Sequence, residues 1–139
     1  MIEDSIRIMQ YRSMPMSIED KNIEAREKRL YSGRKKVRVT HLCPPGVCIN
    51  LFGYMFTYND DWIDDRVVNH ELIHTAQMKE LLVIPFYILY IIEWVVKFFI
   101  YFSWHKAYRN ISFEREAYTH GDDLDYLSHR RPMAWVRFW

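Results

Sequence analysis

Two histidines and a glutamate lie within five consecutive residues, in a spacing that can hold a metal ion and activate water. The residues are His70, Glu71 and His74, in the pattern HExxH. On a helix this spacing puts both imidazoles on one face, one turn apart, so that both can reach a single zinc ion. Glu71 can then polarise the water bound there, take its proton during attack on a carbonyl, and pass the proton to the leaving amine. In the alternative interpretation, the two histidines only cap or pack a polar helix face.

A catalytic zinc site also needs a third protein ligand and an open position for water. The chain after the second histidine reads TAQMKE, so the third ligand must come from further along the sequence. The carboxylate-rich segment 111–123 is the best source and is expected to be an amphipathic helix. Its Glu114 and Glu116 point about 200° apart on a helix, so only one of them can face the metal. His105 and His120 have suitable chemistry, but we expect them at the surface or in a supporting position.

The elements that position these residues follow from hydrophobic spacing and capping residues. An apolar face and acidic residues in the first turn predict a helix through HExxH, capped by Asp60 or Asp61. Residues 37–42 alternate and residues 48–58 are rich in β-forming side chains, with the turn sequence CPPG between them, which predicts a short β-ribbon. Residues 18–32 have helical spacing and many charges, so we expect a surface helix there.

The two cysteines, Cys43 and Cys48, flank the predicted turn. They could form a disulfide across the ribbon, ligate a metal ion or stay free. We expect free thiols in an intracellular chain, because a single C-x4-C pair has no second pair to complete a tetrahedral site.

The predicted elements give a fold class that is mainly α with a small β-ribbon (α+β), and the composition argues against disorder and an all-β chain. The chain has 139 residues, half of them apolar, and few glycines and prolines, which is typical of one compact domain. A net charge of +1 gives the chain no overall positive electrostatic potential that would attract nucleic acid. The expected parts are a charged N-terminal helix (1–36), the β-ribbon (37–58), a metal-binding helical hairpin (60–127) and an aromatic tail (128–139).

Residues 81–102 form an almost continuous apolar window in which Glu93 and Lys97 are the only charged residues. A window of this length can span a membrane, whereas the alternative is a buried hairpin core. Aromatic residues in and after the window, including the terminal AWVRFW, suit the boundary between lipid headgroups and acyl chains.

A shared metal ion would require both ends of this window to return to one place. A single crossing is then excluded, and the window is too short for two full crossings. We therefore predict two antiparallel helices that turn near Glu93 and Trp94, midway between His74 and Glu114. Their apolar tip would dip into one leaflet or pack on a partner. A long continuous helix, with the two motifs meeting across a dimer, is the other possibility.

An HExxH motif followed by a separate glutamate helix resembles the gluzincin group of zinc metallopeptidases. FEREAY at 113–118 resembles the FExxAD element of the membrane peptidases related to the CAAX prenyl proteases and the heat-shock protease HtpX, and the small size resembles the minigluzincins. The resemblance covers roughly residues 37–120 and implies Glu114 as a zinc ligand, with Tyr118 where an aspartate usually follows. It also implies a β-strand that holds substrate, with Tyr54, Tyr58 or His120 as stabilisers of the transition state.

These observations predict a small membrane-associated zinc peptidase that acts on a peptide or protein substrate. Glu71 would be the general base, and the apolar hairpin would contact membrane lipid. The basic residues 34–36 and an N-terminus without an apolar leader point to the cytoplasmic face of a bacterial inner membrane. The alternatives are a non-catalytic membrane-binding module with a structural zinc, and an apolar-tipped protein that inserts into membranes as a toxin or assembly factor.

Overall fold

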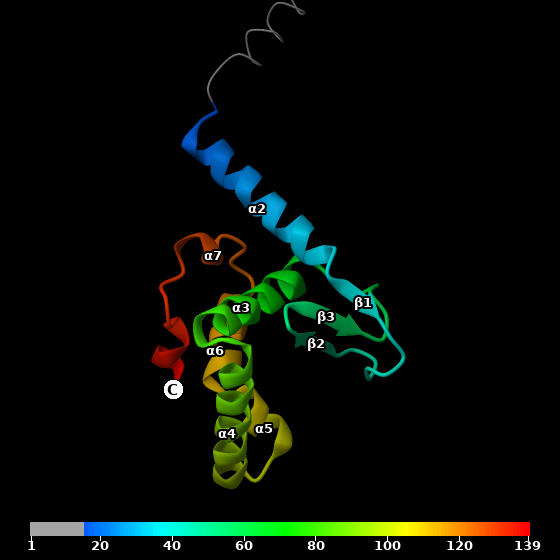
Figure 1. Cartoon of the computed structure of the whole chain (residues 1–139), viewed down its shortest axis with the longest axis vertical. Helices are drawn as coiled ribbons and strands as arrows, with labels where there is room; N and C mark the ends of the chain where they lie inside the picture. Colours follow the sequence, from blue (N-terminus) through cyan, green and yellow to red (C-terminus); the bar gives the residue numbers. More distant parts are fainter. Residues whose placement is uncertain (1–15) are drawn as a thin grey trace, which may run out of the picture.

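The computed structural model describes residues 16–139, and the part of the expected N-terminal helix in residues 1–15 lies outside the described residues. The described chain is mainly helical with one small sheet, which confirms the α+β class (Figure 1). In chain order the elements are α2 (Ile18–Arg34), β1 (Val37–Val39), β2 (Cys48–Leu51), β3 (Tyr54–Thr57), α3 (Asp65–Leu81), α4 (Val83–Tyr101), α5 (Trp104–Arg109), α6 (Ser112–His120), α7 (Tyr126–His129) and the 3₁₀ helix η1 (Ala134–Phe138).

The sheet has three strands in the order β1-β3-β2, with β1 parallel and β2 antiparallel to the central strand β3. The expected ribbon is therefore present, but residues 48–58 form a hairpin of their own. Phe52 and Gly53 make the turn with φ angles of 54° and 83°, the left-handed values that a two-residue hairpin needs. As a result β2 is an edge strand.

The HExxH helix α3 begins later than expected. Its N-cap is Asp64, whose side chain accepts a hydrogen bond from the Val67 backbone nitrogen at 2.9 Å. Asp60 instead accepts a backbone hydrogen bond from Ile63, so the prediction of a cap at Asp60 or Asp61 was wrong. The hydrogen bond between Ile63 and Asp60 closes a tight turn just before α3 begins. Helix α2 crosses α3 closely at Gly33, where an added Cβ would lie 2.7 Å from a side-chain carbon of the neighbouring helix.

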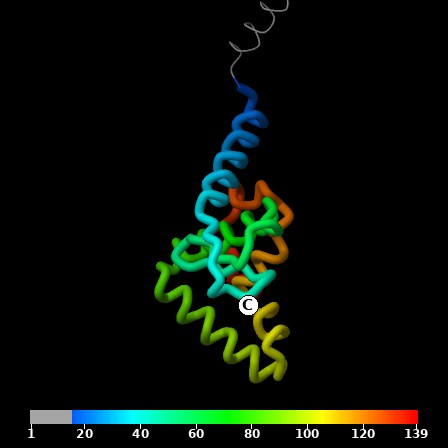
Figure 2. The backbone as a smooth tube through the Cα atoms, turned by 90° about the vertical axis from the view of Figure 1, so that its right-hand side faces the viewer, coloured from blue at the N-terminus to red at the C-terminus, as the bar shows by residue number. Residues whose placement is uncertain are grey.

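The connection between the two motifs is an apolar helical hairpin, but the predicted turn at Glu93 and Trp94 was wrong. Both residues lie inside α4, and the chain turns at Phe102 and Ser103. Phe102 is left-handed (φ 47°), and Ser103 caps α5 with its side chain. Figure 2 shows the backbone turning back on itself at this end of α4.

The turn moved because the chain already bends once before it, at Leu82 (φ 63°) between α3 and α4. The residue opposite Glu114 across the hairpin is therefore Tyr90 of α4 and not His74 of α3. Tyr90 hydrogen-bonds Glu114, and each of these two residues lies twelve positions from Phe102. The motifs meet within one chain although α4 is continuous, so a dimer is not needed to join them.

The main core cluster joins α3, α4, α6 and η1. Its buried side chains are Met78, Phe86, Ile111, Phe113 and Trp135. Trp135 packs on Phe113 with ring centroids 4.6 Å apart. The interpretation of the whole AWVRFW tail as a membrane-interface segment was therefore wrong, because burial in the core competes for the same aromatic surface.

Helix α6 is held to α4 by a buried carboxylate. Glu93 is 3% exposed and accepts hydrogen bonds from the backbone nitrogen and hydroxyl of Ser112, at 2.8 and 2.6 Å. The ammonium of Lys97 lies 3.9 Å away. This contact fixes the first turn of the helix that carries Glu114.

We expect Glu93→Ala to lower the free energy of unfolding by about 3 kcal/mol, because it leaves Lys97 and the Ser112 backbone without their partner. Denaturant unfolding followed by circular dichroism measures this. The control Val96→Ala changes the outward face of the same helix and should cost less than about 0.5 kcal/mol. Equal losses in both variants would contradict the role of the carboxylate.

Candidate metal centre

The three predicted ligands meet at one point between α3 and α6. The Nε2 atoms of His70 and His74 are 3.1 Å apart. The two carboxylate oxygens of Glu114 lie 3.4 Å from Nε2 of His70 and 3.3 Å from Nε2 of His74. One ligand atom from each residue falls within 4.8 Å of the others, so the group could hold a metal ion. The two histidines share a helix face as their spacing requires, and the carboxylate reaches them from the facing helix.

The donor set fits a cation. Oε1 of Glu114 accepts a hydrogen bond from the Tyr90 hydroxyl at 2.7 Å, whereas its Oε2 is buried without a hydrogen-bond partner. A buried carboxylate oxygen without a partner is costly, and a metal ion removes that cost. The electrostatics point the same way. Burial alone would lower the pKa of His74, but the Glu114 carboxylate, with smaller contributions from Glu71 and Gln77, raises it to about 9, so this position favours positive charge.

Gln77 orients one of the two imidazoles. Its amide nitrogen donates to the Phe113 carbonyl at 3.1 Å and to a Glu116 carboxylate oxygen at 3.0 Å. Its amide oxygen therefore faces Nδ1 of His74, 2.8 Å away, and accepts a proton from it. With Nδ1 donating to Gln77, Nε2 is the nitrogen of His74 that faces the centre, and it becomes available to a metal ion when it releases its proton. Gln77 lies three residues after His74, and this helical spacing is the signal that could have identified it.

The second glutamate of FEREAY has a different task. Glu116 is fully buried and accepts hydrogen bonds from Gln77, Tyr126 and Arg130. Arg130 also pairs with Glu80 on α3. Of the two glutamates only Glu114 lies beside the histidines, because Glu116 lies on the far side of α6 in this ion network. The network ties the C-terminal segment to the support of the metal centre.

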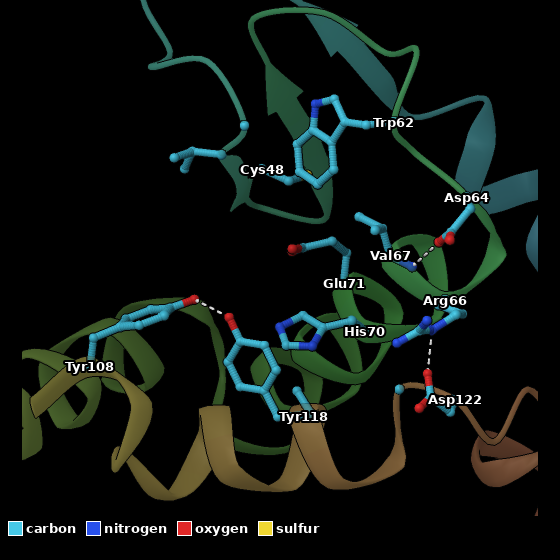
Figure 3. A pocket seen from close by; sticks show the side chains of 14 residues that line it. Cys48, Trp62, Asp64, Arg66, Val67, His70, Glu71, Tyr108, Tyr118 and Asp122 are labelled. Carbon is cyan, nitrogen blue, oxygen red and sulfur yellow. Dashed lines mark hydrogen bonds and ion pairs between the residues drawn. The ribbon is translucent and has the colours of Figure 1, made fainter. Parts of the chain in front are cut away.

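Glu71 lies beside the triad but is not part of it. Its side chain is 5% exposed and reaches into a pocket between Cys48 and Trp62 on one side and His70 and Tyr118 on the other (Figure 3). Burial raises the pKa of Glu71 to about 7, against the opposing effect of nearby His74. A carboxyl group with that pKa can both accept and return a proton near neutral pH.

Strand β2 is joined to the HExxH helix beside this glutamate. The Asn50 side chain donates to the Glu71 carbonyl at 2.7 Å and to the Thr75 hydroxyl at 3.1 Å. Tyr87 of α4 donates to the Asn50 carbonyl at 3.1 Å. These bonds hold the edge strand over the cleft. Cys43 and Cys48 are both free thiols, as expected.

Two cavities flank the triad and share the side chain of Glu71. The larger, about 450 Å³, lies on the His70 side and is rimmed by the ion pair between Arg66 and Asp122. The smaller, about 250 Å³, lies on the His74 side and has a mostly apolar lining. Its wall-forming residues are Val47, Ile49, Leu51, Met78, Phe86, Tyr87 and Tyr90. Together the cavities form an open cleft that runs past the metal centre beneath β2.

The structure does not bring the proposed stabilising residues to this cleft. Tyr54 and Tyr58 are exposed, and neither lines the two cavities. Tyr54 lies under the Arg38 guanidinium, and the His120 ring stacks on Tyr126 with centroids 3.8 Å apart. The strand that carries Tyr54 is central in the sheet and turns its ring to the outer face.

Different tyrosines line the cleft. Tyr108 of α5 lines both cavities, and its hydroxyl lies 3.4 Å from that of Tyr118. The Tyr118 ring packs against the edge of His70, with centroids 4.6 Å apart. Tyr118 comes four residues after Glu114, so helical spacing could have identified it. Tyr108 and Tyr90 reach the site through the hairpin, for which the sequence holds no local signal.

Comparisons with protein-family models, with curated proteins and with solved structures find no match to this chain. The site's geometry and chemistry are therefore the basis for its function.

We expect Gln77→Ala to weaken the affinity for a divalent metal ion by roughly tenfold or more, because His74 loses the partner that fixes its tautomer. Competition with a chromophoric chelator measures the affinity. The control His105→Ala removes an exposed imidazole on α5 and should leave the affinity unchanged. Unchanged affinity in Gln77→Ala would show that the orientation of His74 does not depend on this amide.

Proposed function

We propose that this chain is a small zinc-dependent peptidase of gluzincin type that hydrolyses peptide bonds at a membrane surface. One observation carries the proposal. Glu114 meets His70 and His74 in a buried cluster, and Glu71 lies next to that cluster in an open cleft.

The donor chemistry favours zinc. Two imidazole nitrogens and one carboxylate are a common ligand set for catalytic zinc, which keeps a fourth position for water. The rivals for a fourth protein ligand lie elsewhere, because His105 is exposed on α5 and His120 stacks on Tyr126. A zinc ion in this triad would supply Lewis-acid polarisation of water and of an amide carbonyl. An open position also favours catalysis over a purely structural metal.

Glu71 would carry the proton. Its carboxylate is shared by both cavities, so a peptide bond that crosses from one to the other passes within its reach. As the carboxylate it accepts a proton from the attacking water, and as the acid it delivers that proton to the leaving amine.

The cleft suits an extended peptide. Strand β2 is an edge strand along the smaller cavity. Tyr87 already occupies the Asn50 carbonyl, and the other outward backbone groups of β2 can pair with a substrate segment as an added strand. The apolar wall of that cavity fits a large hydrophobic side chain beside the scissile bond. Tyr108, shared by both cavities, is the phenol best placed to donate a hydrogen bond to the developing oxyanion.

Membrane association is supported by α4. This helix is long and apolar enough to cross a membrane by length and composition, and only 11% of its apolar window is buried. The basic residues 34–36 favour the cytoplasmic face of a bacterial inner membrane as its location.

We expect Glu71→Gln to lower hydrolysis of internally quenched fluorescent peptides by roughly 10²- to 10⁴-fold while one zinc per chain stays bound, because only the proton acceptor is removed. Glu114→Ala should lose the zinc itself. Glu27→Gln, on exposed α2, is the matched control and should retain activity. Full activity in Glu71→Gln would exclude this mechanism, and zinc binding without hydrolysis by the unaltered protein would favour a structural zinc.

We expect Tyr108→Phe to lower kcat by roughly 100-fold with little change in KM, because the lost hydrogen bond forms only as negative charge develops. Tyr54→Phe is the control for a tyrosine on the outer face of the sheet, and its kinetics should match those of the unaltered protein. A change in KM alone for Tyr108→Phe would assign the hydroxyl to substrate binding instead.

A further inference from the structure

The outward face of α4 is more apolar than its inward face. Eight exposed side chains follow one another at helical spacing along nearly the whole helix, and we call them the α4 stripe. They are Ile84, Ile88, Ile91, Ile92, Val95, Val96, Phe99 and Ile100. The two charged residues of α4, Glu93 and Lys97, pair on the opposite face, where Glu93 also binds Ser112 of α6. A helix in water normally has the reverse arrangement.

The stripe is too large to be an ordinary surface feature. Each of its side chains is at least 38% exposed. The largest apolar patch on a typical monomer covers roughly 300–600 Å², and eight such side chains exceed that. Neither charge nor hydrogen-bonding group interrupts the stripe, so any partner must be apolar along the full length of the helix.

The topology prevents α4 from crossing a bilayer. Glu93, in the middle of α4, is hydrogen-bonded to Ser112, and Tyr90 is hydrogen-bonded to Glu114. Helix α6 is thus fastened to the inward face of α4, next to the metal centre. A crossing would put these buried polar contacts and the cleft at the depth of the acyl chains.

Helix α5, which follows the Phe102 turn, argues against insertion of that turn into the bilayer. Helix α5 packs back along the C-terminal half of α4 (Figure 2). It carries the exposed basic residues His105, Lys106 and Arg109. Deep insertion of the Phe102 turn would bury these groups in hydrocarbon, which is costly. At the depth of the headgroups the same residues are favourable, because they can pair with anionic lipids.

We propose that α4 lies along the surface of a lipid bilayer, with the α4 stripe among the upper acyl chains and α5 at the headgroups. The occupant is membrane lipid, whose apolar chains and anionic headgroups match the stripe and the neighbouring basic residues. Phe86 and Tyr90, on the inward face, line the smaller cavity. The cleft then opens on the water side, about one helix diameter, roughly 10 Å, above the lipid. This inference refines the membrane association in the proposed function and does not depend on catalysis.

Binding to phosphatidylcholine–phosphatidylglycerol vesicles tests the stripe. We expect Ile88→Glu/Val95→Glu to bind these vesicles at least tenfold more weakly than the unaltered protein. The matched control is Ile18→Glu/Ile23→Glu, which places the same charges on exposed isoleucines of α2, at the opposite end of the molecule (Figure 1). Zinc content and peptide hydrolysis, measured on the same samples, should be unchanged, so failure of this inference can be told apart from failure of the proposed function.

Equal vesicle binding by the two double variants would overturn the proposal. A dimer in solution that only the α4 variant abolishes, without vesicle binding by the unaltered protein, would overturn it as well and assign the stripe to a second copy of the chain.

The depth of single positions in the bilayer distinguishes a helix that lies flat from one that inserts with its Phe102 end. These measurements use single substitutions in the folded protein. A polarity-sensitive fluorophore is attached at Ile84→Cys, Ile92→Cys, Ile100→Cys or Lys106→Cys, with the unaltered protein as the blank for its own thiols. A flat helix should give similar shallow quenching by brominated lipids at the three stripe positions and an aqueous signal at Lys106→Cys. Deep quenching at positions 100 and 106 with none at 84 would overturn the flat arrangement.

Discussion

The rest of the structure depends on one buried carboxylate placed between two imidazoles. Glu114 is 3% exposed, and a charge at such depth is stable only with partners. The imidazoles from α3 and the Tyr90 hydroxyl from α4 supply them, so three helices must converge at this point. One oxygen of Glu114 still lacks a hydrogen bond, which is the physical reason to expect a cation there. The bend at Leu82 and the turn at Phe102 are the geometric consequences of bringing α3, α4 and α6 together.

A second layer of polar contacts supports the first and reaches the end of the chain. Gln77 links His74 to Glu116, and Glu116 is held by Arg130 from the C-terminal segment. Buried networks of this kind add little net stability, but each member restricts the orientation of the next. The residues after α6 thus act on the candidate metal centre from a distance, and the interpretation of the tail as a membrane-interface segment missed this.

The two faces of α4 differ in chemistry: the inward face makes polar contacts within the chain, and the outward face is apolar. Its inward face supplies Tyr90, Phe86 and Glu93 to the metal centre, the cleft and the α6 contact. Its outward face holds no polar group and has no partner within the described chain. A helix with its charges turned inward is consistent with a protein whose folded body works in water while one side rests on lipid. In the proposed arrangement one rigid element serves both purposes, so the helix itself would set the distance from lipid to cleft.

Local patterns in the sequence determined which residues form the candidate metal site. The spacing of His70 and His74 puts them on one helix face, and the angle between Glu114 and Glu116 leaves one of them for the metal, because helical periodicity is a property of a few adjacent residues. Only the tertiary structure decided the turn at Phe102, the inward position of Trp135 and the choice of Tyr108 over Tyr54 and Tyr58 at the cleft. These depend on how separate helices bend and cross, and on which side chains compete for one buried volume. Such contacts join residues far apart in the chain and leave no periodic signal in it.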